Sequence, residues 1–203
     1  MKRLESILAN LFGIIFLVLS IVITVETVAR KVFSFSIQGA DELGGYALAV
    51  GSTLAFSLAL MGRNHIRVDV FHEMFSRRAQ AFLNWFSITT IALFAIVIAL
   101  VSIKIIRETV EYGSTAQTPW ATPLIWPQGV WYAGFLLFMV VAIIYAARAT
   151  KLYFYGHIDE LNNEFHPKSA KEELKDELDD LENRQIANVD LDAALAPGKG
   201  GVR

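Results

Sequence analysis

The residues that could carry chemistry are few in this chain of 203 residues, and their positions argue against several kinds of site. There are no cysteines, so disulfides, thiolate metal sites and cysteine nucleophiles are excluded. The four histidines, His65, His72, His157 and His166, all fall in expected loops or tails, so a haem held inside membrane helices is not expected. No nucleophile is spaced with a base as catalysis requires. We therefore predict no catalytic residue, no metal site and no cofactor.

The charged side chains are absent from four long stretches of the chain. Uncharged runs cover residues 6–25, 43–62, 79–103 and 112–147, and 54% of all residues are hydrophobic. A charge at the centre of a spanning helix costs about 3 kcal/mol, and about 20 residues cross the hydrocarbon layer. The sequence therefore predicts an all-α integral membrane protein with four transmembrane helices, at about 6–26, 43–62, 79–103 and 127–147.

The last uncharged run is too long for one span, and its first half has a different composition. Prolines and tryptophans gather there at Pro119, Trp120, Pro123, Trp126 and Pro127. Proline fixes the backbone and suits the first turn of a helix, while tryptophan prefers the membrane interface. We expect a rigid periplasmic loop that leads into a fourth span starting near Pro127.

Basic residues near the span ends set the orientation. Eight Lys and Arg residues flank the spans on the side of the N-terminus, the middle loop and the C-terminus, against four on the other side. The positive-inside rule then places both termini in the cytoplasm. The first apolar run is long for a signal peptide and lacks a small-residue cleavage pattern, so we interpret it as a retained span.

The second span carries small residues on one helical face. Ala47, Gly51, Ala55 and Ala59 recur every fourth residue, and Gly44 extends the pattern. Small residues let a neighbouring helix approach closely in lipid. The partner is either another helix of this chain or a different subunit. The third span is almost uniformly apolar by contrast, and such a helix can face lipid.

The interior of the four predicted spans contains no ionisable residue. Ion and proton pathways need such groups at membrane depth, and complete transporters often have helices broken near the midplane. A self-sufficient exporter would need a buried carboxylate, and the nearest one, Glu26, sits at a span end with Arg30 nearby. A membrane anchor or scaffold of another complex is a further alternative. A complete transporter is not expected.

The loop between the second and third spans is amphipathic. Placed on a helix, its apolar residues share one arc and its polar residues the other, which suits a cytoplasmic segment lying along the membrane surface. Arg67 projects into the apolar arc, so we expect it to reach lipid phosphates or a carboxylate.

Several short motifs occur in a fixed order along residues 5 to 150. They are Arg30, the pair Asp41 and Glu42, the set Arg63, His65, Ile66, Val68 and Asp69, and the loop from Thr118 to Pro127. Together they resemble the small membrane subunit, the DctQ-like or Q subunit, of tripartite ATP-independent periplasmic (TRAP) transporters. This family commonly has an aromatic residue before the acidic pair, where this chain has Gly39 and Ala40.

The resemblance implies partners and a role. A large membrane subunit would hold the sodium and substrate sites, a periplasmic substrate-binding protein would deliver the solute, and the small subunit would brace the scaffold in the bacterial inner membrane. We expect the small-residue face or the segment 63–69 to contact the large subunit, and the loop around Trp120 and Trp126 to contact the binding protein. The solute, whether a dicarboxylate, sialic acid or an ectoine-like zwitterion, is not encoded in this chain.

The chain divides into a membrane domain, residues 1–157, and an acidic cytoplasmic tail, residues 158–203. Residues 159–192 hold 4 Lys and Arg against 12 Asp and Glu. A capping box at Ser169 to Glu172 predicts a short helix over about 170–184, and the end of the chain is expected to be disordered. Nothing forms the basic face that nucleic-acid binding needs.

Overall fold

The structure is a computed structural model, and it describes residues 2–36, 39–62 and 75–165 together with short helical pieces between 174 and 186. The chain forms two compact units, Met1–His166 and Pro167–Arg203. The first unit holds all of the elements considered below. The amphipathic loop predicted before the third span and most of the predicted 170–184 helix lie outside the described residues.

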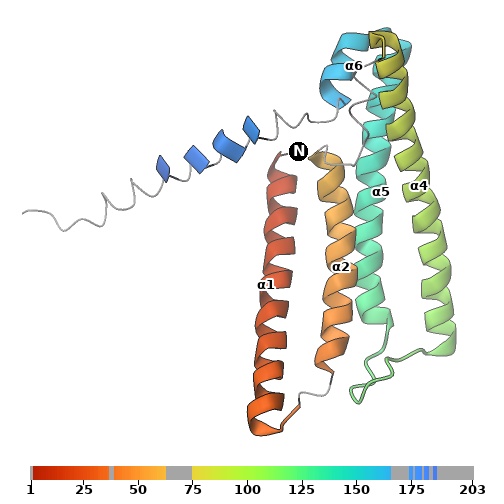
Figure 1. Ribbon diagram of the computed structural model, residues 1–203. Coiled ribbons are helices and arrows are strands. Elements are labelled where there is room, and N and C mark those ends of the chain that lie inside the picture. Colours follow the sequence, from red (N-terminus) through yellow and green to blue (C-terminus); the bar gives the residue numbers. More distant parts are fainter. Residues whose placement is uncertain are drawn as a thin grey trace, which may run out of the picture. The chain divides into compact units, whose positions relative to one another are not determined.

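Five named helices make up the first unit within the described residues (Figure 1). They are α1 (Lys2–Phe33), α2 (Ala40–Met61), α4 (Arg77–Tyr112), α5 (Ile125–Phe154) and α6 (Ile158–Phe165). The only β-structure in that part of the chain is an isolated bridge between Thr115 and Pro123. The all-α class is therefore confirmed.

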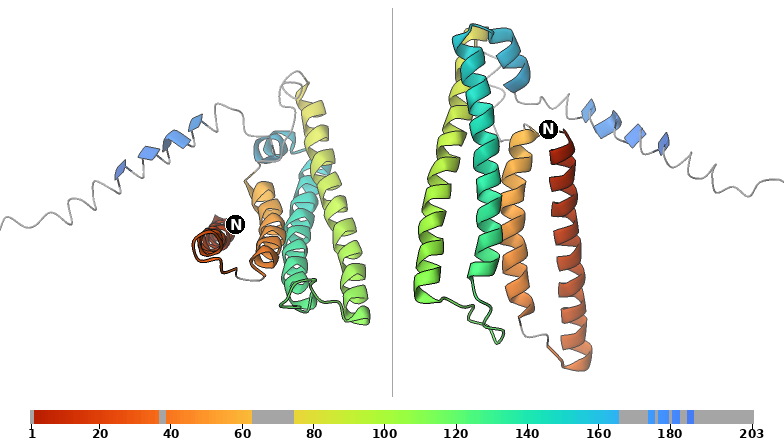
Figure 2. Two further views of the ribbon diagram at one scale, coloured as in Figure 1. Left: turned by 60° about the horizontal axis from the view of Figure 1, so that its bottom comes forward. Right: turned by 180° about the vertical axis from the view of Figure 1, so that it is seen from behind.

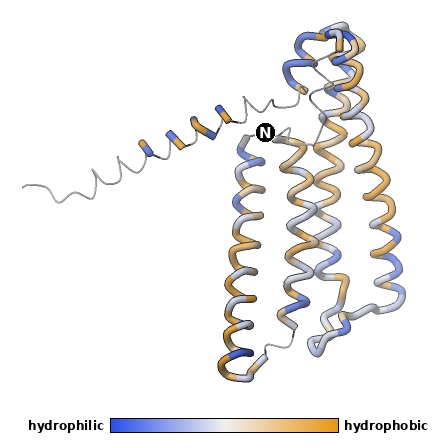
Figure 3. The backbone as a smooth tube through the Cα atoms, in the orientation of Figure 1, coloured by the Kyte–Doolittle hydropathy of each residue, from blue (hydrophilic) through white to orange (hydrophobic). Residues whose placement is uncertain are grey.

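Four of these helices are long and apolar enough to cross a membrane, which confirms the predicted number of spans. α1, α4 and α5 run past their predicted limits at both ends, and α2 begins before its predicted start, because a charge-free run stops at the first charge, whereas a helix continues through charged turns. α4 has 36 residues, or about 54 Å at about 1.5 Å each. Figure 3 shows hydrophobic residues concentrated along the middle of the helices and hydrophilic ones toward their ends.

The helices are arranged as a row in the order α1, α2, α5, α4. The main contacts join α1 to α2, α2 to α5 and α5 to α4, as the views in Figures 1 and 2 show. The row brings α5 between α2 and α4, although α5 is the last of the four along the chain. We call the end with the 113–124 loop the loop end, and the other the α6 end.

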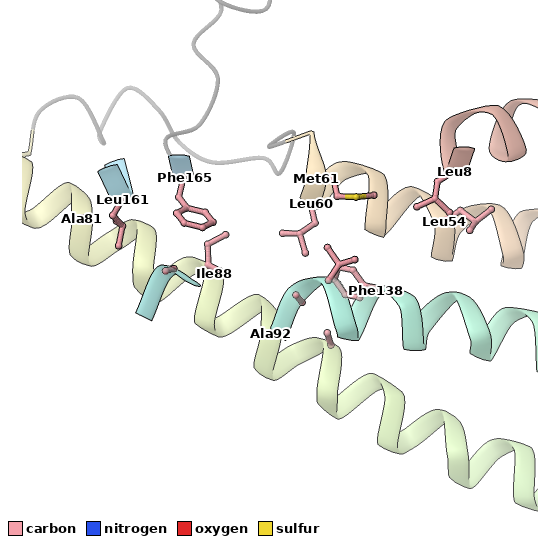
Figure 4. Close-up of a cluster of buried hydrophobic side chains, with 14 residues drawn as sticks. Leu8, Leu54, Leu60, Met61, Ala81, Ile88, Ala92, Phe138, Leu161 and Phe165 are labelled. Atoms are coloured by element: carbon pink, nitrogen blue, oxygen red, sulfur yellow. The ribbon is translucent and has the colours of Figure 1, made fainter. Parts of the chain in front are cut away.

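The buried core follows the contacts between neighbouring helices (Figure 4). Along α4 the buried residues are alanines and polar residues, with Ile88 as the one large aliphatic side chain, and most are three or four positions apart, whereas α5 contributes the larger Phe138 and Val141. α4 therefore buries one stripe and exposes Leu93 and Phe94 on another face. The buried residues of α4 are Ala81, Asn84, Ile88, Ala92, Ala95, Ala99, Ser102 and Thr109.

The short helix α6 folds back onto α4 and α5 and belongs to the first unit. Leu161 is fully buried and Phe165 nearly so. The amide of Asn162 donates to the carbonyl of Arg77 at 3.0 Å and accepts from Asn84 at 3.1 Å. The acidic composition of the residues after 157 predicts the start of the tail. In the structure, residues 158–165 instead form part of the first unit, which we also call the membrane unit.

Candidate functional site

Glu42 connects two distant parts of the chain at the loop end. It lies in the first turn of α2, is 8% exposed, and accepts a hydrogen bond of 2.5 Å from the Tyr46 hydroxyl. The Thr118 hydroxyl donates to its other oxygen, and Thr122 is a further hydrogen-bonding neighbour. A carboxylate here is also favoured by the helix dipole. We call Glu42, Tyr46, Thr118 and Thr122 the Glu42 clasp, which ties the 113–124 loop to α2.

Gly39, just before α2, is the second contact between the loop and this helix. Its φ of 104° is left-handed, a conformation that favours glycine. A Cβ atom at Gly39 would lie 2.6 Å from Cδ2 of Trp120, so the indole ring covers the glycine directly. Two residues before the acidic pair Asp41 and Glu42, the chain therefore has a glycine that is covered by a loop tryptophan.

The loop is also held by its own backbone. The amide of Ala116 donates to the carbonyl of Thr122 at 2.9 Å, and that of Leu124 donates to the carbonyl of Ser114 at 3.1 Å. These bonds flank the bridge between Thr115 and Pro123 and make a short hairpin. The loop is therefore a shaped surface fixed at both its base and its tip.

The predicted loop residues occupy the hairpin and the start of α5. Pro119 and Pro123 are exposed, Trp120 is 47% exposed and Trp126 is 72% exposed. Pro127 lies in the first turn of α5, where a missing amide proton costs nothing because the first four amides of a helix have no internal partner. Trp126 is the most exposed indole at this end among these residues.

The small residues of α2 do not all face the same neighbour. Gly51 is buried, and a Cβ atom there would lie 2.4 Å from Cε2 of Phe16 on α1, so this position serves a contact within the chain. Ala47, Ala55 and Ala59 are half-buried, and Gly44 has open space where a Cβ atom would be. Only Gly51 is committed to α1 by a close approach of this kind.

The sequence analysis missed a second close approach, at Gly134 of α5. A Cβ atom at Gly134 would lie 2.1 Å from the hydroxyl oxygen of Thr53 on α2. Thr53 is 1% exposed and donates to the carbonyl of Val50 at 2.8 Å. A lone glycine in the middle of an apolar span is the signal that could have indicated this contact.

The charged motif residues are spread over the unit. Arg30 and Asp41 are exposed, whereas Glu26 is 5% exposed and accepts a hydrogen bond of 2.8 Å from Ser36. Glu26 and Glu42 are thus both held near the loop end. The remaining motif residues, Arg63, His65, Arg67 and Asp69, lie outside the described residues.

An apolar groove of about 690 Å³ runs between α1, α2 and the start of α5. Its walls include Val18 of α1, Val50 and Ala47 of α2, and Trp126 and Val130 of α5. Almost all of its lining is apolar, so it suits acyl chains or an apolar helix and not a charged solute. In the described part of the chain, no three acidic or histidine side chains come together to hold a metal ion.

Comparison with known protein families gives one match to this chain that covers most of the helices described above. A family model described as the DctQ component of tripartite ATP-independent periplasmic transporters matches residues 19–152, which is more than half of the chain. No curated protein matches the chain. The matched region runs from the middle of α1 to the last turn of α5, and includes the Glu42 clasp and the loop.

Proposed function

The chain belongs to the DctQ family and is the small membrane subunit of a TRAP transporter, and from that premise we propose how it acts. It braces the large transport subunit of a sodium-coupled importer in the bacterial inner membrane, with both termini in the cytoplasm. The solute is an organic acid or a zwitterion, delivered by a periplasmic binding protein.

The chemistry inside the spans supports a bracing role and not a transport site. The buried polar residues at the helix contacts are neutral, namely Thr53, Ser57, Asn84 and Ser102. The buried carboxylates Glu26 and Glu42 lie near the loop end. A path for sodium and an anionic solute needs charged or coordinating groups at membrane depth, so that path belongs to the large subunit.

The row of helices is the observation that carries the proposal. α1 makes its main contact with α2 alone, and only 6% of its most apolar window is buried within the chain. The row leaves large apolar side chains exposed, for example Leu48 of α2, Leu93 of α4 and Ile144 of α5. A second membrane protein can pack along one side of this row over several helices. The row would then widen that protein without adding a transport site.

We assign the contact with the large subunit to the exposed face of α2. Leu48, Ser52 and Phe56 are exposed and lie four residues apart on one face, with the half-buried Ala55 and Ala59 beside them. Gly51 is a poor probe of this contact, because a larger residue there would push against Phe16 of the same chain.

Two matched substitutions test this assignment. Ser52 on α2 and Thr90 on α4 are both exposed, and each hydroxyl donates to the carbonyl four residues earlier in its own helix, at 2.7 and 2.8 Å. Ser52→Phe should reduce the amount of large subunit that co-purifies with the tagged chain by about tenfold, while Thr90→Phe leaves it unchanged. Loss of the complex in Thr90→Phe with retention in Ser52→Phe would place the contact on α4 instead.

The shaped loop is the proposed contact with the binding protein. The Glu42 clasp and the Gly39 contact fix the loop, and Trp126 offers a large exposed ring, as binding surfaces commonly do. Trp126→Ser should weaken capture of the binding protein by the purified membrane complex several-fold, with Trp131→Phe as a half-buried aromatic control. Equal capture by both variants would remove the loop from the interface.

A further inference from the structure

The α6 end contains a pocket, lined by both charged and apolar residues, that the bracing role does not use. Its volume is about 630 Å³, and it lies between the last two turns of α5 and the first turn of α6. Arg148, Lys151 and Tyr155 contribute from one face of α5, because they are three or four residues apart. His157 and Glu160 close the other side.

The turn between α5 and α6 creates this pocket. Gly156 has a φ of 78°, and the amide of His157 donates back to the carbonyl of Leu152 at 3.0 Å. This left-handed end reverses the chain, so that α6 returns across the face of α5 that carries Arg148 and Lys151. The apolar Leu152 lines the pocket between the charged groups.

The pocket contains separate positive and negative groups. Glu164 pairs with Nε of Arg148 at 2.6 Å, and the Nη groups of a guanidinium carry further donors. His157 lies 3.4 Å from Glu160. Lys151 makes no ion pair with any of the described residues. An ammonium that has no ion pair within the described part of the chain, beside a carboxylate, suits a ligand that carries both charges.

Aromatic residues indicate that the pocket lies at the level of the lipid headgroups. Trp85 of α4 donates to the hydroxyl of Thr150 at 3.0 Å, and its ring stacks on Tyr153 with centroids 5.2 Å apart. Thr150 is next to Lys151 in sequence, and Tyr155 is 73% exposed. Trp and Tyr gather where the hydrocarbon layer meets the headgroups, and basic pockets at that level recognise phospholipids.

We propose that this pocket binds the headgroup of a zwitterionic, amine-bearing phospholipid. Lys151 and Arg148 hold the phosphate, Glu160 accepts from the ammonium, and the acyl chains lie along the apolar surface of α5. The lining of this pocket includes none of the α2 residues that we assign to the contact with the large subunit.

Binding of added lipid to the full-length chain in detergent tests the proposal. Native mass spectrometry after delipidation should show phosphatidylethanolamine bound more tightly than phosphatidylglycerol, and no binding of inorganic phosphate at the same concentration. Lys151→Met should weaken phosphatidylethanolamine binding about tenfold, since a charged hydrogen bond contributes about 1.5–3 kcal/mol. Lys104→Met, which removes an exposed lysine at the other end of the unit, should leave binding unchanged.

Two results would overturn the site. One is equal lipid binding by Lys151→Met and the unmodified chain, and the other is binding of inorganic phosphate as tightly as lipid, which would indicate a simple anion site. Glu160→Gln checks the headgroup assignment. It should remove the preference for phosphatidylethanolamine over phosphatidylglycerol, and a preference that persists would contradict the role given to Glu160.

Discussion

At the scale of single residues, the loop end is organised by one carboxylate and one glycine. Glu42 accepts from two hydroxyls of different segments, and Gly39 makes room for the ring of Trp120. Both contacts join residues nearly 80 positions apart in sequence, so they fix the loop relative to α2 and not only within itself. A loop that is held in one shape loses less conformational freedom if it binds another protein.

Glu42→Gln tests the clasp. The amide keeps the size of the side chain but lacks its charge, and hydrogen bonds to an ionised acceptor are about twice as strong as neutral ones. We expect a loss of about 1–2 kcal/mol in the free energy of unfolding, measured on the purified chain in detergent. Faster proteolysis within residues 113–124 should accompany it. Asp41→Asn, at the exposed neighbouring position, should change neither property, and equal effects of the two substitutions would contradict the clasp.

The sequence could identify Glu42 as one of an acidic pair but could not show which of the two is buried. Asp41 and Glu42 are adjacent, and a helix turns by about 100° between them, so one faces the loop and the other faces outward. Which one faces inward depends on where the loop returns. That path is set by contacts between Thr118 and α2 that no local pattern contains.

At the scale of elements, the helix contacts depend on a few positions without a side chain. Gly51 admits Phe16 of α1, and Gly134 admits Thr53 of α2. α4, which packs on α5, buries four alanines instead. Packing between membrane helices relies on close approach, because the surrounding lipid is as apolar as the helices themselves.

Gly134→Ala tests the contact between α2 and α5. The added methyl group would collide with the Thr53 hydroxyl, so α2 and α5 must separate slightly, and we expect a loss of about 1–3 kcal/mol in the free energy of unfolding. Gly129→Ala, where a Cβ atom meets nothing within 4 Å, should be neutral or slightly stabilising. Combining Gly134→Ala with Thr53→Ala should recover part of the loss, and no recovery would mean that a different neighbour is responsible.

Asn162→Ala tests whether α6 is part of the membrane unit. The substitution removes the hydrogen bonds that Asn162 makes with the buried Asn84 and with the carbonyl of Arg77. We expect a loss of about 1–3 kcal/mol in the free energy of unfolding, and faster hydrogen exchange in residues 158–165. Unchanged exchange in Asn162→Ala would show that α6 does not depend on these bonds.

The elements differ in how far the sequence could predict them. The number of spans was predictable from the charge-free runs and from the cost of burying charge, and the four long apolar helices confirm it. Their ends were less predictable, because α1 and α4 continue through charged turns. α6 was assigned to the tail because of its acidic residues, although Leu161 and Phe165 form a buried face on a helix of 8 residues.

At the scale of the whole membrane unit, the order of helices in the row was not predictable. Each span has an apolar surface all round, and the lipid does not favour one neighbour over another. The order α1, α2, α5, α4 is set by the short hairpin between α4 and α5 and by the glycine contacts on α2 and α5. A row exposes far more apolar surface than a closed bundle of the same helices, and this surface is what a larger membrane subunit would cover.

The central claim, that this chain supports transport by a partner without transporting anything itself, is tested most directly by reconstitution. Proteoliposomes with the large subunit, this chain or both would be given the solute-loaded binding protein and a sodium gradient, and solute uptake would be measured. We expect sodium-dependent uptake only when both membrane subunits are present. Uptake by this chain alone, or undiminished uptake by the large subunit without it, would contradict the account.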